Sequence, residues 1–443
     1  MDETVEKRVS RLRDEINRHI YLYHSKDDPE ISDEEYDELF AELQALESEY
    51  PELVSGDSPT QRVGAPPSEG FAPVEHEVPM LSLANARTAE ELLGWQKRIR
   101  TRLEKADVDP GQITWVTEPK IDGLAISLTY ENGRFVRGAT RGDGSVGEDV
   151  TRNIETIASL PKRIEGAPPL IEVRGEVYLP IPDFAELNRR RTEAGLPAFA
   201  NPRNSAAGSI RQIDPAAAAE RPLAVWSYGI GVTDGFEFET HSEEVEWLAG
   251  HGFPTNPDTA THKSIEEVLD RCQWWLDRRE DLEFEIDGVV VKVDQLSLWR
   301  ELGVAGREPR WSIAWKFPPT TATTLLREID WNVGRTGHLV PWAMLEPVRV
   351  GGVTVSTATL HNEEDLERKD VRAGDEVVVL RAGDVIPQVV SALPQKRPEG
   401  AVRPGPPEKC PACGTKVVKP EDSVFSICPN RTGCPGQIFQ HIK

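Results

Sequence analysis

The stretch Glu118-Pro119-Lys120-Ile121-Asp122-Gly123 places a lysine directly before an apolar segment, residues 124–130. A second apolar segment, residues 135–140, follows after Asn132-Gly133. Asn-Gly is the strongest short signal for a two-residue hairpin turn, because both residues tolerate positive φ. We therefore predict a β-hairpin over residues 124–140 with Lys120 at its open end, inside a domain that mixes helices with antiparallel strands.

A lysine in this position is either a nucleophile or a solvated charge at a strand end. The amine of a lysine attacks only after it has lost a proton, and its unperturbed pKa is about 10.4. Four residues with one wildcard do not decide between these interpretations. The decision rests on the segments that follow Lys120 in the chain.

Two of these segments combine backbone signals with charged side chains. Residues 141–149 form a glycine-rich loop that begins with an arginine, whose guanidinium and neighbouring amides suit a phosphate or a sugar. Residues 171–179 alternate, so that one strand face is apolar and the other carries Glu172, Arg174 and Glu176. Each charge also has an ordinary explanation, as a salt bridge or a solvated tip.

Three later segments add cations. Residues 199–212 carry Arg203 and Arg211, and residues 311–317 alternate aromatic side chains with Lys316. In residues 284–293, Lys292 falls on the apolar face of a predicted strand. A lysine there is seldom buried without a partner, so we expect one.

Taken in order, these segments resemble the nucleotidyltransferase motifs of NAD-dependent DNA ligases. The resemblance continues in residues 23–37, in residues 78–83 and in a cluster of cysteines, so it covers nearly the whole chain. The matching motifs are Lys120-Ile-Asp-Gly123, Thr140-Arg-Gly-Asp-Gly144 with Gly147-Glu-Asp-Val-Thr151, Arg174-Gly-Glu-Val177, Asn201-Pro-Arg-Asn204 with Ala206-Ala-Gly-Ser209, Glu285-Ile-Asp-Gly-Val-Val-Val-Lys-Val293 and Trp315-Lys-Phe-Pro318.

The resemblance implies a ligase that seals nicks in duplex DNA during replication and repair. Lys120 would attack the adenylyl phosphorus of NAD⁺, giving lysyl-AMP and releasing nicotinamide mononucleotide. AMP would then pass to the 5′-phosphate at the nick, and the 3′-hydroxyl would displace it. Charge spreads over phosphate oxygens in each transfer, so such a site needs cations and positioning above all.

The resemblance also assigns roles to single residues. Glu176 and Arg141 would hold the ribose, and Mg²⁺ or Mn²⁺ would lie near Asp122 or Asp287. The further residues expected around the nucleotide are Ser82, Leu83, Glu118, Arg203, Arg211, Lys292 and Lys316.

The N-terminal segment reads as two packed helices. Apolar residues recur about every fourth position over residues 3–24, and Ser32-Asp-Glu-Glu35 fits a capping box before a second periodic segment. Polar residues near the connecting loop suit helix caps and surface positions. The resemblance instead implies that they grip the nicotinamide mononucleotide half of NAD⁺, whose cationic ring suits aromatic and acidic neighbours: Tyr23, His24, Asp33, Tyr36 and Asp37.

Domain boundaries follow from changes in composition. We expect a helical nicotinamide-mononucleotide-binding domain at 1–70, a mixed α/β nucleotidyltransferase domain (ATP-grasp-like ligase, adenylation) at 71–318, an OB-fold barrel at 319–394 and a zinc finger at 405–437. Residues 64–79 read as a linker and residues 88–107 as a helix. We expect the barrel to consist of short strands from Trp331 onward, with a hairpin at residues 348–355 and a helix at residues 362–370. It is either a spacer or a DNA-binding module with Arg335 and Arg381 as contacts.

Four of the five cysteines lie near the C-terminal end as Cys410-x2-Cys413 and Cys428-x5-Cys434. Two close pairs of thiols suit tetrahedral Zn²⁺, although the second spacing is wider than usual, and reduced thiols without metal are the alternative. All four positions are cysteine, so the zinc would be structural. Cys272 stands apart, and we expect it in a core.

Length and charge bound the function. A chain of 443 residues suggests three to four domains. We expect no signal peptide, because the first residues lack the basic and apolar regions of one. The sequence also has no apolar run near the roughly 18 residues of a membrane span. We expect a cytoplasmic monomer. The net charge of -24 disfavours phosphate binding, yet residues 1–70 hold 19 acidic and 7 basic residues, and residues 319–443 hold 15 of each. The acid excess resembles that of proteins from salt-loving organisms.

Two other functions remain open. An ATP- or GTP-dependent nucleotidyltransferase, such as an ATP-dependent ligase or an RNA capping enzyme, would share the lysine motif but lack residues 1–70. A non-catalytic nucleic-acid-binding protein would need the barrel and the zinc module but not Lys120, Lys292 and Lys316. The family normally continues with helix-hairpin-helix repeats and a BRCT domain, whereas this sequence stops at Lys443. It is either a piece of a longer protein or a naturally short form that lacks these domains, and the sequence does not decide between the two.

Overall fold

The computed structural model describes residues 3–26, 31, 33–55, 58–61, 70–109, 112–196, 199, 201–318, 320–350, 353–381, 387–398, 400–420, 423 and 425–442. The chain forms two compact units. The first unit consists of Met1–Glu30 and Glu34–Phe317, and the second consists of Ile31–Asp33 and Pro318–Lys443. None of the described helices is both long and apolar enough to cross a membrane.

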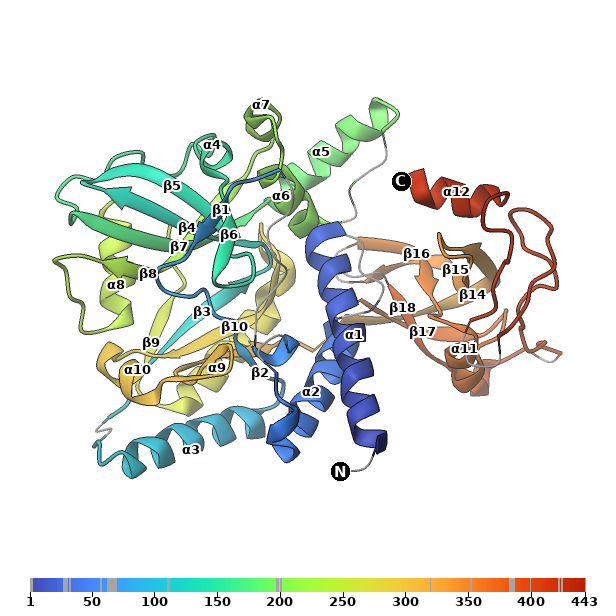
Figure 1. Ribbon diagram of the computed structural model, residues 1–443, viewed down its shortest axis with the longest axis horizontal. Coiled ribbons are helices and arrows are strands. Elements are labelled where there is room, and N and C mark those ends of the chain that lie inside the picture. The colour runs from blue at the N-terminus through green and yellow to red at the C-terminus, as the bar shows by residue number, and fades with distance from the viewer. Residues whose placement is uncertain are drawn as a thin grey trace. The chain divides into compact units, whose positions relative to one another are not determined.

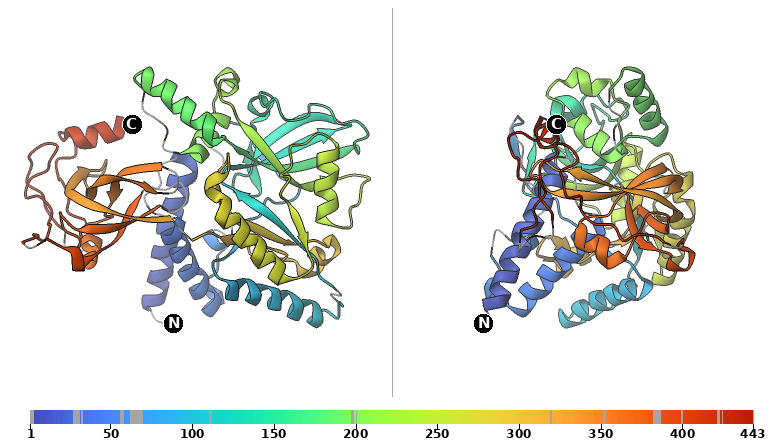
Figure 2. Two further views of the ribbon diagram at one scale, coloured as in Figure 1. Left: turned by 180° about the vertical axis from the view of Figure 1, so that it is seen from behind. Right: turned by 90° about the vertical axis from the view of Figure 1, so that its right-hand side faces the viewer.

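The first unit begins with the two predicted helices, which lie side by side (Figures 1 and 2). Apolar side chains four residues apart on the first helix, among them Leu12 and Ile16, pack against Phe40 and Leu43 of the second. The predicted cap Ser32 lies outside the described residues. The elements are α1 (Glu3–Lys26), α2 (Asp33–Glu49), η1 (Pro51–Leu53) and η2 (Pro59–Gln61).

The remainder of this unit is a mixed α/β domain built on two largely antiparallel sheets, as predicted. One sheet has the order β2-β13-β10-β3-β9, with β13 and β2 parallel, and the other has the order β5-β4-β7-β8. Their strands are β2 (Ala84–Ala86), β3 (Trp115–Ile121), β9 (Ala260–His262), β10 (Ile286–Val293), β13 (Ser312–Lys316), β4 (Leu124–Glu131), β5 (Arg134–Thr140), β7 (Leu170–Tyr178) and β8 (Ala224–Thr233).

The predicted hairpin is confirmed as β4 and β5, and Asn132 and Gly133 have the positive φ values of 49° and 74° that this turn needs. The position expected for Lys120 was wrong. Lys120 lies within β3, which pairs with β10 in the other sheet, and the chain changes sheets immediately afterwards. Gly123 makes the change of sheet possible, because a Cβ there would lie 2.3 Å from the carbonyl oxygen of Val177.

Helices cover the first sheet and complete its core. The helix predicted at residues 88–107 is confirmed as α3 (Ala89–Lys105), capped by Thr88. It packs with α9 (Ile265–Arg278), whose Cys272 is fully buried in the same core, as predicted. The other helices of this domain are α4 (Thr151–Ile154), α5 (Ile181–Glu193), α6 (Pro202–Ile210), α7 (Pro215–Ala219), α8 (His241–Gly250), η3 (Arg279–Asp281) and α10 (Leu296–Leu302).

Part of the predicted linker at residues 64–79 is ordered structure. Strand β1 (Pro73–Glu75) pairs with β6 (Val146–Glu148), so the chain is fastened beside the glycine-rich loop; residues 62–69 lie outside the described part. A second small ribbon, β11 (Val304–Ala305) with β12 (Glu308–Pro309), precedes β13.

The second unit contains the expected closed barrel, in the order β14-β15-β16-β18-β17. Its first two strands are long, spanning Thr320–Val333 and Leu339–Val350, so the expectation of short strands from Trp331 was wrong. The predicted helix is confirmed with Asn362 as its cap, and Val350 pairs with Val353 across the predicted hairpin. The elements are β14 (Thr320–Val333), β15 (Leu339–Val350), β16 (Val353–Thr359), α11 (Glu363–Lys369), β17 (Glu376–Arg381) and β18 (Gln388–Ala392).

The cysteine-bearing segment packs onto this barrel. Barrel residues Val333 and Leu339 share a buried cluster with Cys410, Cys428 and Cys434. The backbone amide of Cys428 also donates to the carbonyl of Gly337 at 2.8 Å. The remaining elements are η4 (Pro394–Lys396) and α12 (Pro435–Ile442).

Candidate functional site

A cavity of about 470 Å³ in the first unit collects residues that are far apart in the sequence. Tyr36 and Asp122 are not among its lining residues, and the side chains of Tyr23, His24 and Asp33 lie outside the described part. The candidate residues that line it are Asp37, Ser82, Leu83, Glu118, Lys120, Arg141, Glu176, Arg203, Arg211, Lys292 and Lys316.

At one end of the cavity, Lys120 and Lys316 converge on a single carboxylate. Their Nζ atoms lie 3.0 Å and 2.6 Å from Oδ2 of Asp287. The strand register explains the convergence, because both lysines are paired with Gly288, one from each side of β10. Burial alone would raise the pKa of Asp287, but the two ammonium groups outweigh burial and lower it.

Farther along the same strands lies a second cluster of charges. Glu118 precedes Lys120 by two residues on β3, so it faces the same side about 7 Å away. Its carboxylate lies 2.8 Å from Lys292 and 2.6 Å from His241. Burial opposes ionisation of Glu118, but these two cations lower its pKa to about 2. Lys292 therefore has Glu118 as the partner that a lysine on an apolar strand face requires. It belongs to a different cluster from Lys316, which pairs with Asp287.

Glu176 and Arg141 also line the cavity, and the charge of Arg141 acts on Glu176. Burial raises the pKa of Glu176 to about 7, although the nearby charges of Lys120, Arg203 and Arg141 work against this rise. Burial also lowers the pKa of Arg141. Glu176 projects from β7 on the charged face that the alternation of this strand predicted.

Arg203 and Arg211 stand at the two ends of α6. Asn201 caps this helix, and Arg203 in its first turn donates to Oδ1 of Asp122. Arg211 follows the last turn and lies 2.9 Å from Glu148 of β6. Helix α6 therefore brings two cations to the cavity, each held by a buried carboxylate.

The amides of the glycine-rich loop do not behave as predicted. The amides of Ser145 and Val146 both donate to Asp143, and those of Asp143 and Gly144 donate to carbonyl oxygens of the same loop. These amides are already used, so they are not available to a phosphate. The loop contributes Arg141, Gly142 and Glu148 to the cavity.

Sequence reasoning missed three groups at the cavity. His241 and Glu244 belong to α8, whose polar first turn looks like an ordinary helix start. Arg307, between β11 and β12, lies with its guanidinium 4.0 Å from the ring centre of Phe40. Arg307 also hydrogen-bonds the Tyr36 side chain, so α2 is fastened to the rim of the cavity. Only the folding of distant segments brings these groups together.

Asp287 and Asp122, the two carboxylates expected near Mg²⁺, are not equally suited to bind it. The Oδ1 atom of Asp287 is buried and has no hydrogen-bond partner among the described residues, which suits a cation that prefers oxygen ligands. One oxygen of Asp122, in contrast, already accepts from Arg203. Of the two predicted positions, Asp287 fits a divalent cation better.

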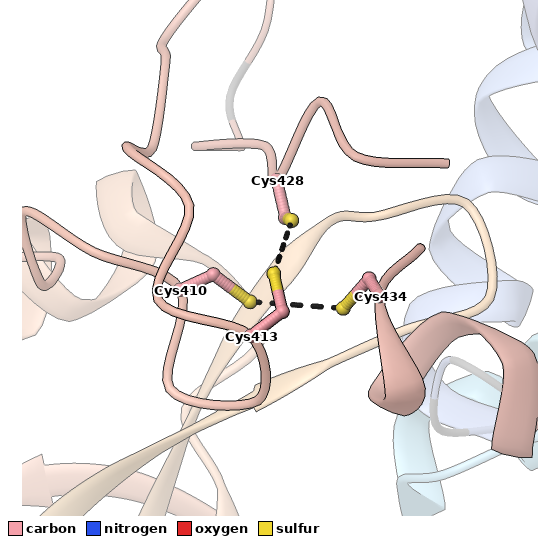
Figure 3. A group of neighbouring side chains, drawn as sticks. All are labelled: Cys410, Cys413, Cys428 and Cys434. Atoms are coloured by element: carbon pink, nitrogen blue, oxygen red, sulfur yellow. Dashed lines mark hydrogen bonds between the residues drawn. The ribbon is translucent and has the colours of Figure 1, made fainter. Parts of the chain in front are cut away.

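The second unit holds a candidate metal centre. The Sγ atoms of Cys410, Cys413, Cys428 and Cys434 all lie within 4.8 Å of one another and point to one centre (Figure 3). The separations are 3.8 Å for Cys410 to Cys434 and 3.5 Å for Cys413 to Cys428. Zinc–sulfur bonds of about 2.3 Å at tetrahedral angles place sulfurs about 3.8 Å apart, so the cluster fits one structural Zn²⁺.

Family models cover both units. The NAD-dependent DNA ligase adenylation domain matches residues 68–320, and the NAD-dependent DNA ligase OB-fold domain matches residues 323–401. The N-terminal NAD⁺-binding domain of DNA ligase-like proteins matches residues 2–64, and the NAD-dependent DNA ligase C4 zinc finger domain matches residues 409–435.

Curated relatives agree with these models. The DNA ligase from Rubrobacter xylanophilus is 52% identical to this chain over 98% of its residues. The DNA ligases from Desulforudis audaxviator and Thermomicrobium roseum are 50% and 51% identical to this chain, over 98% and 99% of its residues. The matches take up 63%, 64% and 63% of those proteins, so the chain spans just under two thirds of their length. With its NAD⁺-binding, adenylation, OB-fold and C4 zinc finger domains, the chain belongs to the family of NAD-dependent DNA ligases.

Proposed function

We propose that this chain acts as an NAD⁺-dependent DNA ligase, which joins the 3′-hydroxyl and the 5′-phosphate at a nick in duplex DNA through a lysyl-AMP intermediate. The observation that carries the proposal is the convergence of Lys120 and Lys316 on Asp287 in a cavity that also holds the Glu118–Lys292 pair. Lys120 would be the nucleophile, and the two charge clusters would each bind a different part of a single nucleotide.

The two clusters suit the two ends of an adenylyl group. A carboxylate beside an ammonium offers an acceptor next to a donor, which matches the 6-amino group and N1 of adenine. We therefore assign Glu118 and Lys292 to the base. The phosphate end is assigned to the cations that surround Lys120, namely Lys316, Arg203 and Arg211. Glu176 and Arg141, which also line the cavity, are assigned to the ribose.

In the first step, the Nζ of Lys120 loses its ammonium proton to solvent and forms a bond to the adenylyl phosphorus of NAD⁺. The nitrogen releases a second proton to solvent as the phosphoramidate forms. The bond from that phosphorus to the oxygen of nicotinamide mononucleotide breaks, and this leaving group departs with the electron pair. The surrounding cations face the charge that develops on the phosphate oxygens. Mg²⁺ bound at Asp287 would neutralise further charge on these oxygens.

The N-terminal helices are proposed to hold the leaving group. Asp37 lines the cavity and lies 3.0 Å from Arg87, and Tyr36 contacts Arg307, so both residues of α2 stand at its rim. We assign Tyr23, His24, Asp33, Tyr36 and Asp37 to the nicotinamide mononucleotide half. In-line attack requires this half to lie opposite Lys120.

The second unit is proposed to bind the nicked duplex as part of a monomeric enzyme in the cytoplasm, where NAD⁺ and replicating DNA occur together. Arg335 and Arg381 are the candidate DNA contacts, and the C4 zinc finger would stabilise the barrel beside which it folds. We propose the domain limits 1–70, 71–318, 319–394 and 405–437 for the helical, adenylation, OB-fold and zinc-finger parts.

The test uses NAD⁺ labelled at the adenylyl phosphate. The protein should acquire one covalent label, Lys120→Ala should acquire none, and labelled ATP should not replace NAD⁺. His24→Ala and Asp33→Ala should also fail to become labelled, yet should seal a nick whose 5′ end already carries AMP. Absence of a label on the wild-type chain, or equal labelling from ATP, would contradict the proposal.

A further inference from the structure

His241 is buried between two carboxylates at the start of α8. It is 1% exposed, its Nε2 lies 2.6 Å from Oε1 of Glu118, and its Nδ1 lies 2.9 Å from Oε2 of Glu244. The capping box of Thr240 and Glu243 fixes the first turn of the helix and therefore the position of the imidazole. Helix α8 thus holds the imidazole of His241 against the carboxylate of Glu118.

The contacts decide the protonation of His241. If Nε2 were an acceptor, two acceptors would stand 2.6 Å apart, so this nitrogen carries a proton. Nδ1 faces a carboxylate as well and also donates. Burial and the Lys292 charge lower the pKa of His241, but contact with Glu118 and Glu244 outweighs them and raises it. Lys292 Nζ, 2.9 Å from Nε2, does not need this nitrogen, because it has Oε2 of Glu118 at 2.8 Å and the Tyr228 carbonyl at 3.3 Å.

These contacts fix the chemical character of Glu118. Its Oε1 accepts from His241 and its Oε2 accepts from Lys292, so the carboxylate can neither rotate freely nor take up a proton readily. The lone pairs that remain can only accept. A ligand that meets Glu118 in the cavity must therefore bring a hydrogen-bond donor.

We propose that His241, supported by Glu244, is a positioning residue that sets the base specificity of the nucleotide site. The proposal rests on the function proposed above, in which this cavity binds the adenylyl group. The 6-amino group of adenine donates to Glu118, whereas the 6-oxo group of hypoxanthine would face a fixed acceptor. A site built around a buried hydrogen bond rejects such an analogue strongly, and we expect roughly 10²-fold or more discrimination in the wild type.

The test compares the rate of covalent adduct formation with NAD⁺ and with nicotinamide hypoxanthine dinucleotide, at subsaturating concentrations of each. His241→Ala should lower the NAD⁺-to-hypoxanthine rate ratio by roughly tenfold or more, the range for loss of a hydrogen bond to a charged group. His241→Gln can still donate to Glu118 and should keep part of the ratio. His251→Ala is the control, since His251 follows the same helix and stacks on Trp247 at 3.9 Å.

The outcomes separate this proposal from the proposed function. If the wild type forms no adduct with NAD⁺, the proposed function fails. If adduct forms but folded His241→Ala keeps the wild-type ratio, or slows equally with both dinucleotides, the role of His241 in specificity is refuted. If His241→Ala does not fold, the same rate ratio is measured with Glu244→Gln, and that result decides the role of His241. Glu244→Gln keeps the size of the side chain while weakening the support of His241, so it must lower the ratio in the same direction.

Discussion

Lys120 and Asp287 form an ion pair with 3.0 Å between Nζ and Oδ2, although 167 positions separate them in the chain. The pair forms because β3 and β10 are neighbours in one sheet and because Gly288 leaves room for the chain of β13. A Cβ at Gly288 would lie 2.3 Å from the carbonyl oxygen of Trp315. Asp287 is therefore a residue that holds the amine of Lys120 in place.

The first prediction follows from this pair. Asp287→Asn keeps the shape of the side chain but leaves two ammonium groups beside a neutral amide, which misplaces Lys120 and removes the candidate Mg²⁺ ligand. The rate of adduct formation from labelled NAD⁺ should fall by about 10²-fold or more, measured in a single turnover. Asp281→Asn, at an exposed position of η3, is the control. A variant within about threefold of wild type would show that Asp287 does not position the nucleophile.

Glu176 should make stability depend on pH. Its pKa is raised from 4.5 to about 7, so between these values the folded state binds more protons than the unfolded state. The free energy of unfolding contributed by this group is therefore lost as pH rises from about 4.5 to about 7. Glu176→Gln is neutral at every pH and avoids this loss.

The melting temperature of Glu176→Gln should thus match the wild type near pH 5 and exceed it by a few degrees near pH 8. Other titrating groups are common to both proteins, so the difference in melting temperature isolates position 176. The same variant should form adduct more slowly if Glu176 binds the ribose. A difference that stays constant from pH 5 to pH 8 would be evidence against the raised pKa.

Features that arise from neighbouring residues could be predicted from the sequence, whereas contacts between distant segments could not. The hairpin at Asn132-Gly133, the alternation of β7 and the helix after Thr88 depend on neighbouring residues, and all three could be predicted. The strand that contains Lys120 was missed because Pro119 interrupts its pattern and its partner β10 lies far along the chain. His241 and Arg307 had no local signal, since their importance comes from segments that meet only after folding.

Zinc should support the barrel as well as its own module, because Val333 and Leu339 of the barrel pack against three of the cysteines. We predict one zinc ion per chain by elemental analysis. Cys428→Ser should lose the metal and lower the melting temperature of the barrel, and a strong chelator should do the same to the wild type. Cys272→Ala should retain full zinc, because Cys272 lies in another core. Protein purified without chelator and lacking stoichiometric zinc would refute the assignment.

Salt should stabilise the fold. A surface with a net charge of -24 repels itself until ions screen the charges, and the Debye length falls from about 10 Å at 0.1 M to about 3 Å at 1 M. We predict a higher melting temperature in molar KCl than in dilute buffer. An unchanged melting temperature would count against the resemblance to proteins from salt-loving organisms.

Arg307 provides a test of how the N-terminal helices take part in the reaction. Its guanidinium lies over Phe40 of α2 and hydrogen-bonds Tyr36, while its backbone carbonyl accepts from Ser82 at 3.0 Å. It therefore ties α2 to the rim of the cavity. If α2 holds the nicotinamide mononucleotide half, this tie matters only while that half is the leaving group.

Arg307→Met keeps an apolar stem over Phe40 but removes the charge and the hydrogen bond. Loss of a cation–π contact together with a hydrogen bond should slow adduct formation from NAD⁺ by roughly tenfold or more. Sealing of a nick that already carries AMP should proceed at the wild-type rate, because this substrate bypasses the first transfer. Arg300→Met, at an exposed position of α10, should leave both activities unchanged. If both activities of Arg307→Met fall together while the melting temperature holds, Arg307 acts on the adenylyl site itself and not through the docking of α2.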